Sequence, residues 1–286
     1  MPELPEVETV LRGLEPYLKA ATIKKVTLNR KNLRFDFPRG FISQLEGQQI
    51  IALNRRAKYL IFNLSNGSNL LSHLGMSGNF TILDPKADKS GIKHLHVEFS
   101  ILAENGEPHT LIYTDPRRFG FMDIFSSEEN CKFLCDLGPE PLGNGFNAIA
   151  LVKIFAKKRT PIKSALLDQK NVAGLGNIYV CEALWRAKIH PRTPVNKLID
   201  ENNTPDERLE KLVQAVRNIL QKAIKAGGST LNDFHGATGQ QGYFQHSVDV
   251  YGKEGKPCNA QNCTAIIERI TQAGRSSFFC PNCQKA

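Results

Sequence analysis

The sequence lacks a long hydrophobic run. No apolar stretch in its 286 residues approaches the roughly 20 residues that a membrane-spanning helix needs. It also lacks a cationic start leading into an apolar signal core, so we expect a cytoplasmic protein without a signal peptide. Repeats and low-complexity tracts are absent too, and 41% of the residues are hydrophobic, which excludes collagen-like and disordered proteins. This length predicts about two domains with buried cores.

Acidic residues are fewer than basic ones. The chain has 28 Asp plus Glu against 37 Lys plus Arg, a formal net charge of +9. A basic balance favours a polyanion as partner, nucleic acid before an anionic membrane surface. Charge alone leaves open the alternative that the lysines form a solvated surface.

Seven cysteines are unevenly spread, and four of them lie in the last 29 residues. These four are Cys258, Cys263, Cys280 and Cys283, with the spacing C-x4-C-x16-C-x2-C. Two pairs separated by strand-forming residues suit a tetrahedral zinc site with four thiolate ligands. Two disulfides are the alternative, but the lack of a secretion signal indicates a reducing compartment. We therefore expect one structural Zn²⁺ ion in a zinc-finger β-hairpin.

The hydrophobic pattern predicts a first domain made mostly of β-strands. Apolar residues at helical spacing predict an amphipathic helix over 6–18. Short apolar runs separated by Gly, Asn, Asp and Pro then follow as far as residue 125, which is typical of an antiparallel sandwich or barrel. The predicted strands are 23–28, 49–53, 59–64, 70–73, 80–83, 95–99, 110–114 and 121–125.

A different pattern follows residue 135, so the predicted fold class is α+β with several domains. The segment 136–147 is rich in glycine and proline and predicts a linker. Beyond it, helical spacing predicts helices at 148–157, after Thr160-Pro161, after Asn177, and over about 206–225, where Gly227 and Gly228 end the last one. Residues 229–246 are polar, and both a ligand-covering loop and an inert surface loop fit them.

The N-terminus is the first candidate for chemistry. Removal of Met1 would expose the secondary amine of Pro2, followed at once by Glu3. An α-amino group titrates nearer neutrality than lysine, so it can attack an electrophilic sugar carbon while a neighbouring carboxylic acid protonates the leaving oxygen. The same acidic turn also suits a helix start, and from these residues alone the helix cap is the simpler interpretation.

Basic residues recur at predicted turns. In Arg117-Arg118-Phe119 the side chains can hydrogen-bond a base edge and wedge into a base stack, or be two surface cations beside a buried ring. The turn Gly174-Leu175-Gly176-Asn177 opens a helix whose amides suit a phosphate. Cations placed where phosphates could pass are Arg55, Arg56, Lys58, Arg117, Arg118, Lys157, Lys158, Arg159, Lys163 and Arg275. DNA binding should then weaken steeply with salt.

Together these motifs resemble one family, the bacterial formamidopyrimidine-DNA glycosylases. The resemblance runs from Met-Pro-Glu-Leu-Pro-Glu-Val-Glu-Thr through His-Leu-Gly-Met-Ser-Gly and Tyr-Thr-Asp-Pro-Arg-Arg-Phe-Gly to Gly-Arg-Ser-Ser-Phe-Phe-Cys. It implies a catalytic β-sandwich domain with a leading helix (1–135), a linker (136–147), a helix-two-turn-helix DNA-binding region (148–228), a lesion-capping loop (229–246) and a zinc finger (247–286).

The resemblance implies a nucleoid-associated base-excision repair enzyme that acts on damaged double-stranded DNA. We expect a monomer, because one lesion needs only one site. Such an enzyme removes oxidised purines, 8-oxoguanine and formamidopyrimidines, through a Schiff base on Pro2, and cleaves the abasic site by β,δ-elimination. Glu3 would be the acid, Glu6 its support, Lys58 the proton donor for β-elimination, and Arg275 the residue of the δ step. The remaining implied roles are base-stack filling by Met76, Arg117 and Phe119, DNA contacts by His94, Arg117, Arg159 and Asn177, and lesion covering by Tyr243.

Two alternatives remain beside this assignment. The sister endonuclease VIII branch uses the same amine chemistry on oxidised pyrimidines, although Leu4, Met76 and the Arg117–Phe119 set favour the purine branch. A non-catalytic zinc-ribbon protein that binds nucleic acid would share the charge and the fold. The first cysteine pair also departs from the family, which typically has C-x2-C where this chain has C-x4-C, so we expect a looser knuckle.

Overall fold

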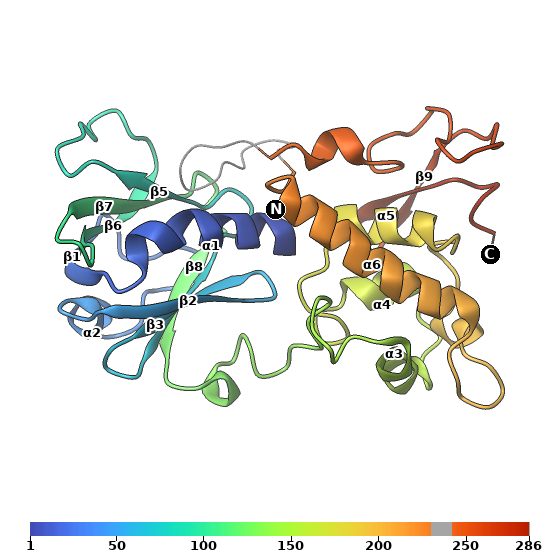
Figure 1. Cartoon of the computed structure of the whole chain (residues 1–286), viewed down its shortest axis with the longest axis horizontal. Helices are drawn as coiled ribbons and strands as arrows, with labels where there is room; N and C mark the ends of the chain where they lie inside the picture. Colours follow the sequence, from blue (N-terminus) through green and yellow to red (C-terminus); the bar gives the residue numbers. More distant parts are fainter. Residues whose placement is uncertain (230–241, 286) are drawn as a thin grey trace. The chain divides into compact units, whose positions relative to one another are not determined.

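The computed structural model describes residues 1–229 and 242–285 (Figure 1). The chain divides into two compact units, one formed by Met1–Cys135 with Ile224–Gln245 and the other by Asp136–Ala223 with His246–Ala286. Antiparallel sheets, a leading helix and a cysteine-rich hairpin confirm the predicted fold class. Most of the predicted loop, residues 230–241, lies outside the described residues.

Two four-stranded antiparallel sheets form the first unit. The first has the strand order β1 (Thr22–Leu28), β6 (Leu95–Leu102), β7 (Pro108–Thr114) and β5 (Asn79–Leu83). The second has the order β2 (Ile50–Arg56), β3 (Tyr59–Leu64), β4 (Asn69–His73) and β8 (Phe121–Phe125). Every predicted strand is present. Some are longer than predicted because backbone pairing continues past the apolar run, as where Asn54–Arg56 pair with Tyr59–Ile61.

Helix α1 (Leu4–Leu18) packs against strands of both sheets (Figure 1). Val7, Val10 and Leu14 recur every three or four residues and are fully buried in the core between the sheets. Pro5 lies in the first turn, where a backbone N–H has no partner within the helix. The short helix α2 (Phe41–Leu45) was not predicted, because five residues are too few to show a helical period.

The second unit is helical and ends in a β-hairpin. Its helices are α3 (Ala148–Phe155), α4 (Ile162–Leu167), α5 (Asn177–Arg186) and α6 (Glu207–Lys225), whose last residues reach the first unit, and its hairpin pairs β9 (Glu268–Gln272) with β10 (Arg275–Phe279). Short 3-10 turns occupy Glu128–Asn130, Val195–Leu198 and Phe244–Ser247. The polypeptide leaves α6 through Gly227 and Gly228, which have φ of +73° and +79°, as predicted for the end of this helix.

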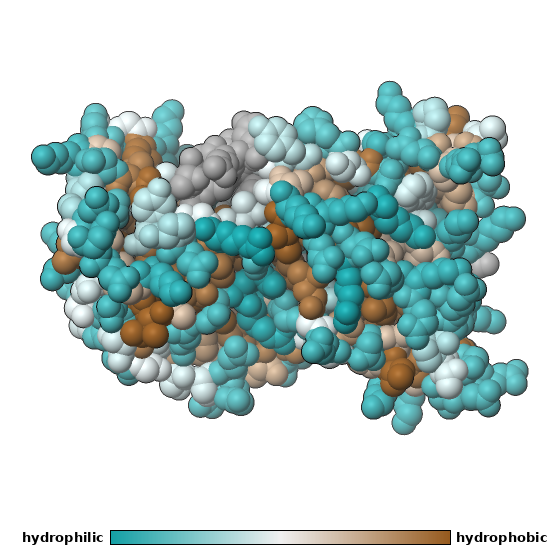
Figure 2. Space-filling model, viewed as in Figure 1, coloured by the Kyte–Doolittle hydropathy of each residue, from teal (hydrophilic) through white to brown (hydrophobic). Residues whose placement is uncertain are grey.

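Hydrophilic residues cover most of the face shown in Figure 2, with apolar residues scattered between them. Among the described helices, none combines the length and the hydrophobicity of a membrane span.

Candidate functional site

Pro2, Glu3 and Glu6 are buried together at the start of α1. The Glu3 side chain accepts a hydrogen bond from the backbone of Glu6, and Glu6 Oε2 accepts one from the Glu3 N–H at 2.9 Å. This reciprocal pair is a capping box, which satisfies N–H groups that have no partner within the helix. The helix-cap interpretation is therefore correct, and it does not exclude a catalytic one, since the cap buries both carboxyl groups beside Pro2.

Glu6 also holds the base of the segment that the sequence predicts to cover a lesion. Its Oε1 accepts a hydrogen bond from the Ser229 N–H at 2.8 Å. A Cβ at Gly228 would lie 3.1 Å from the Glu6 side chain, and a Cβ at Gly242 only 2.3 Å from the Gly228 carbonyl oxygen. Ser229 pairs with the exposed Tyr243, so both ends of 230–241 meet beside Glu6. Only these two ends of the predicted loop are described.

Lys58 lies in the tight turn between β2 and β3 and is buried. The preceding residue, Ala57, has a φ of +52°. Arg55 fixes the turn, because its Nε donates to Glu8 of α1 at 2.9 Å and its Nη1 donates to the Ala57 carbonyl at 3.0 Å. Our placement of Arg55 among cations accessible to phosphates is therefore wrong, because its guanidinium is paired with Glu8 and ties the Lys58 turn to α1.

His73, which lies near Lys58, was not predicted as a site residue. His73 is directly paired with Tyr59 in β3 and with Phe121 in β8, and its ring stacks on the Phe121 ring. Burial, and then the positive charges of Lys58 and Arg34, lower the pKa of His73 to about 4. At neutral pH the imidazole is therefore uncharged and adds no second positive charge beside Lys58.

The lowered pKa of His73 predicts a stability that falls in acid. In the unfolded chain its pKa is near 6.5, so between pH 6.5 and 4 the unfolded state binds more protons, and stability is lost as the pH falls through this range. The full effect is about 3 kcal/mol. Between pH 7 and pH 4.5, the unfolding free energy of a His73→Gln variant should fall by about 2 kcal/mol less than that of the parent. Urea unfolding at both pH values measures it, and equal losses in the variant and the parent would contradict it.

A buried Asp115 joins the two loops that carry Met76 and Arg117–Phe119. Its Oδ1 accepts a hydrogen bond from the Ser77 hydroxyl at 2.6 Å, and its Oδ2 accepts one from the Gly120 N–H at 2.8 Å. At Gly75, with a φ of +62°, a Cβ would lie 2.3 Å from the Gly120 nitrogen, so the loops approach more closely than a side chain allows. The sequence contained Asp115 in a quoted motif but gave no sign of this role.

The loop residues predicted to enter DNA remain exposed. Met76 is 37% and Phe119 44% exposed, and the Arg117 guanidinium lies 5.1 Å from the centre of the Phe119 ring. Large apolar side chains held on anchored loops are typical of binding sites. The His94 carbonyl accepts a hydrogen bond from the Asp115 N–H at 3.1 Å, so His94 belongs to the same group of loops. Their contacts with DNA stay predictions.

In the second unit, two side chains hold the hairpin next to Arg275. The Nζ of Lys163 donates to the Ser276 carbonyl at 2.9 Å and to the Ser277 hydroxyl at 2.6 Å, and the Asn177 side chain donates to the same carbonyl at 2.9 Å. Lys163 is only 1% exposed, so our expectation that phosphates could reach it is wrong. Arg275 is exposed at the first position of β10.

Two further sequence features of this unit can be located. Asn177 opens α5 after Gly176, as the glycine-rich turn predicts. Arg159 is exposed in the loop that follows α3.

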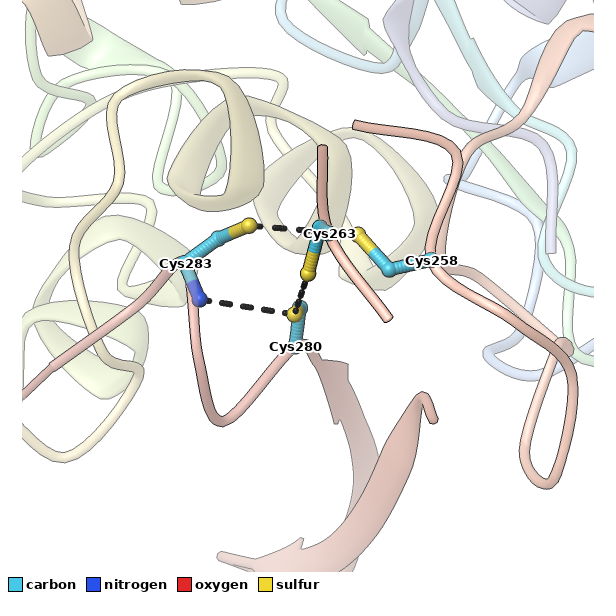
Figure 3. A group of neighbouring side chains, drawn as sticks. All are labelled: Cys258, Cys263, Cys280 and Cys283. Carbon is cyan, nitrogen blue, oxygen red and sulfur yellow. Dashed lines mark hydrogen bonds between the residues drawn. The ribbon is translucent and has the colours of Figure 1, made fainter. Parts of the chain in front are cut away.

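The four C-terminal cysteines form a metal site. Their sulfur atoms all lie within 4.8 Å of one another and point toward one another in Figure 3. The sulfur atoms of Cys258 and Cys283 are 3.9 Å apart and those of Cys263 and Cys280 are 3.6 Å apart, close to the roughly 3.8 Å between ligands of a tetrahedral zinc–thiolate site. The C-x4-C knuckle therefore fits one ion, and the predicted four-cysteine site is confirmed.

Hydrogen bonds from polar groups to these sulfur atoms favour the thiolate forms that bind a metal, whereas burial raises the pKa values of Cys280 and Cys283. The backbone N–H groups of Ala260 and Cys283 donate to the sulfur atoms of Cys258 and Cys280. The Asn282 side chain donates to Cys263 at 3.5 Å, and this hydrogen bond is the main cause that lowers the pKa of Cys263 to about 6.

Comparison with known proteins finds the same three parts. Residues 1–122 match the formamidopyrimidine-DNA glycosylase N-terminal domain, 137–235 the H2TH domain of that enzyme, and 255–286 a zinc finger found in FPG and IleRS. A formamidopyrimidine-DNA glycosylase of Allorhizobium ampelinum is 47% identical over the whole of both chains. A variant of Lactococcus lactis FPG in complex with Fapy-dG-containing DNA has a TM-score of 0.86 and 36% identity, again over both whole chains. The wild-type L. lactis protein with DNA containing an oxidised pyrimidine has a TM-score of 0.84 and 37% identity, with the same coverage.

Proposed function

Since this chain belongs to the formamidopyrimidine-DNA glycosylase family of base-excision repair enzymes, we propose that it removes oxidised purines from duplex DNA and cleaves the resulting abasic site. The observation that carries this proposal is the buried acidic start of α1, where the capping box holds the Glu3 and Glu6 carboxyl groups beside Pro2. The proposed substrates are 8-oxoguanine and formamidopyrimidines.

In the proposed reaction, the amine of Pro2 is the nucleophile once Met1 has been removed. The amine attacks C1′ of the damaged nucleotide as the bond from C1′ to the base breaks, while Glu3 acts as the acid at the sugar. Loss of the amine proton and opening of the sugar ring, in which the C1′–O4′ bond breaks and Glu3 protonates O4′, leave an iminium between Pro2 and C1′. The burial of Glu3 beside Pro2 supports this role.

The iminium then accepts the electrons released when the sugar loses its 2′ proton, so the 3′ phosphate leaves in β-elimination. A second elimination expels the 5′ phosphate. We assign the proton donor and phosphate contact of the first elimination to Lys58, whose turn is fixed to α1 through Arg55, and the second to Arg275 on the anchored hairpin. Hydrolysis finally frees the Pro2 amine from the sugar remnant.

Damaged double-stranded DNA is the proposed partner. The damaged base must leave the helix to reach Pro2, and we assign the filling of the vacated space to Met76, Arg117 and Phe119, with Arg117 facing the orphaned cytosine. Their exposure on loops anchored by Asp115 supports this role. The other proposed DNA contacts are His94, Arg159 and Asn177, with Tyr243 in the loop over the extruded base. One lesion needs one site, so we propose a monomer that works in the cytoplasm at the nucleoid.

Borohydride trapping with a panel of lesions tests the reaction and the substrate together. We expect a covalent adduct with duplex containing 8-oxoguanine opposite cytosine. Glu3→Gln should form that adduct about a hundredfold more slowly, because general acid catalysis is lost. The variant should still trap a preformed abasic site, which contains no base to release. If the parent forms no adduct with any lesion, the proposed mechanism is wrong.

Oxidised pyrimidines are the second candidate substrates. The L. lactis relative in complex with DNA containing an oxidised pyrimidine favours this possibility. In the same panel, faster adduct formation with thymine glycol than with 8-oxoguanine opposite cytosine would make oxidised pyrimidines the main substrates. This result would overturn the purine assignment.

A further inference from the structure

A groove beside the zinc site belongs to none of the machinery described above. It has a volume of about 440 Å³ and is lined by the last turn of α5, one face of α6 and the cysteine-bearing loops. Asn177 opens α5 and Arg186 ends it, so these residues are about 14 Å apart along the helix. The groove therefore lies at the end of α5 opposite the proposed DNA contact.

The rim of the groove is positively charged. Arg186, Lys188, Lys211 and Lys222 line it, and no carboxylate does. Arg186 is paired with Asp249 and Lys211 with Glu207, each at 2.6 Å. Within the described parts of the chain, Lys188 and Lys222 have no ion pair. Two cations without an ion pair in the lining of one groove attract an anionic partner.

The floor of the groove is apolar. It contains the side chains of Trp185 from α5, Ala215 from α6 and Ala260 from the first cysteine-bearing loop. The indole Nε1 of Trp185 is buried and has no hydrogen-bond partner among the described residues, although buried indole N–H groups usually have one. The groove thus offers an aromatic side chain together with two cations that have no ion pair among the described residues.

We propose that this groove docks an acidic peptide segment of another protein, with one aromatic or large aliphatic side chain against Trp185 and flanking carboxylates at Lys188 and Lys222. The volume is within the range of sites that enclose small ligands, so it accommodates one such side chain and its neighbouring backbone. A nucleic-acid strand fits less well. Its evenly spaced phosphates need cations along a track, whereas these cations surround an apolar floor.

The chain provides its own probe for this site. Trp185 is the single tryptophan, so its fluorescence reports on the groove without a label. Titration of the full zinc-loaded protein with the peptide Asp-Glu-Asp-Phe-Glu-Asp should change the emission saturably, with half-saturation at micromolar concentration. Replacing Phe by Ala in the peptide, or the acidic residues by their amides, should weaken binding at least tenfold.

Matched variants separate docking from general charge attraction. Lys222→Glu should weaken peptide binding at least tenfold, and Lys225→Glu, with the same charge change on the same helix outside the groove, should not. Asn218→Phe fills the groove without changing charge and should also weaken binding. All three variants should keep the parent's activity on 8-oxoguanine duplex, so the outcome is independent of the proposed repair reaction.

Three results would overturn the proposal. The first is a lack of saturable change in Trp185 emission. The second is equal weakening by the Lys222 and Lys225 variants, which would indicate nonspecific attraction. The third is tighter, Lys222-dependent binding of a single-stranded oligothymidylate than of the peptide, which would make the groove a nucleic-acid site.

Discussion

A chain that carries extra residues before Pro2 should lose base removal, strand cleavage and borohydride trapping together. An extension converts the secondary amine into an amide, which has no nucleophilic lone pair. We expect each activity to fall by about three orders of magnitude or more, as when a covalent nucleophile is removed. Single-turnover cleavage of 8-oxoguanine duplex, with and without a protease-removable tag before Pro2, measures the loss. Removal of the tag should restore activity.

A Pro2→Gly variant is the matched test of the same nucleophile. It keeps a free amine, but a primary one on a flexible residue, so we expect most of the trapped adduct to be lost. DNA binding and the circular dichroism spectrum should stay unchanged if Pro2 acts in the chemical step. Full activity in the tagged chain would instead favour a nucleophile elsewhere, and binding without cleavage in the parent would favour the non-catalytic zinc-ribbon protein.

Loss of zinc should weaken DNA binding at least about a hundredfold. A two-stranded hairpin is barely stable alone, and structural zinc in zinc-finger peptides supplies about 10 to 16 kcal/mol of folding free energy. Without the metal, β9 and β10 would separate, and Arg275 would lose its fixed position. Lys163, buried against the hairpin, would lose the hydrogen bonds to Ser276 and Ser277, so the disturbance would extend into α4.

Cys280→Ser and the control Cys135→Ser test this dependence. Cys280 is a buried member of the metal site, whereas Cys135 is an exposed cysteine outside it. Zinc content by elemental analysis and DNA affinity by fluorescence anisotropy should both fall in the first variant and persist in the second. An unchanged affinity in a preparation shown to be free of zinc would mean that the hairpin does not contribute to DNA binding.

Helices and strands were predictable from the sequence where apolar residues recur at a regular spacing over several turns or strands. Residues 6–18 and 206–225 show several turns of helical spacing, and the strands show apolar runs between turn residues. The metal site was predictable because thiol ligands are rare and their spacing is constrained. Helix α2 was missed because it is too short to show a period.

Burial of charged groups could not be predicted in the same way. Arg55 and Lys163 looked like surface cations, but Glu8 and the hairpin backbone surround them in the folded chain. Asp115 and His73 owe their positions to residues that are remote in sequence, such as Ser77 and Phe121. A sequence shows which charges exist, whereas the contacts that neutralise or bury them depend on tertiary structure.

The Glu6 carboxyl group connects two parts of the chain through hydrogen bonds. One oxygen holds the Glu3 N–H, and the other holds the Ser229 N–H where the segment 230–241 begins. Two sites that share one rigid group are thermodynamically coupled, and such coupling acts equally in both directions. A change that moves Ser229 away from Glu6 should therefore disturb the Glu3 turn, and a change in that turn should disturb Ser229. A single carboxyl group thus couples the start of α1 to the paired residues Ser229 and Tyr243.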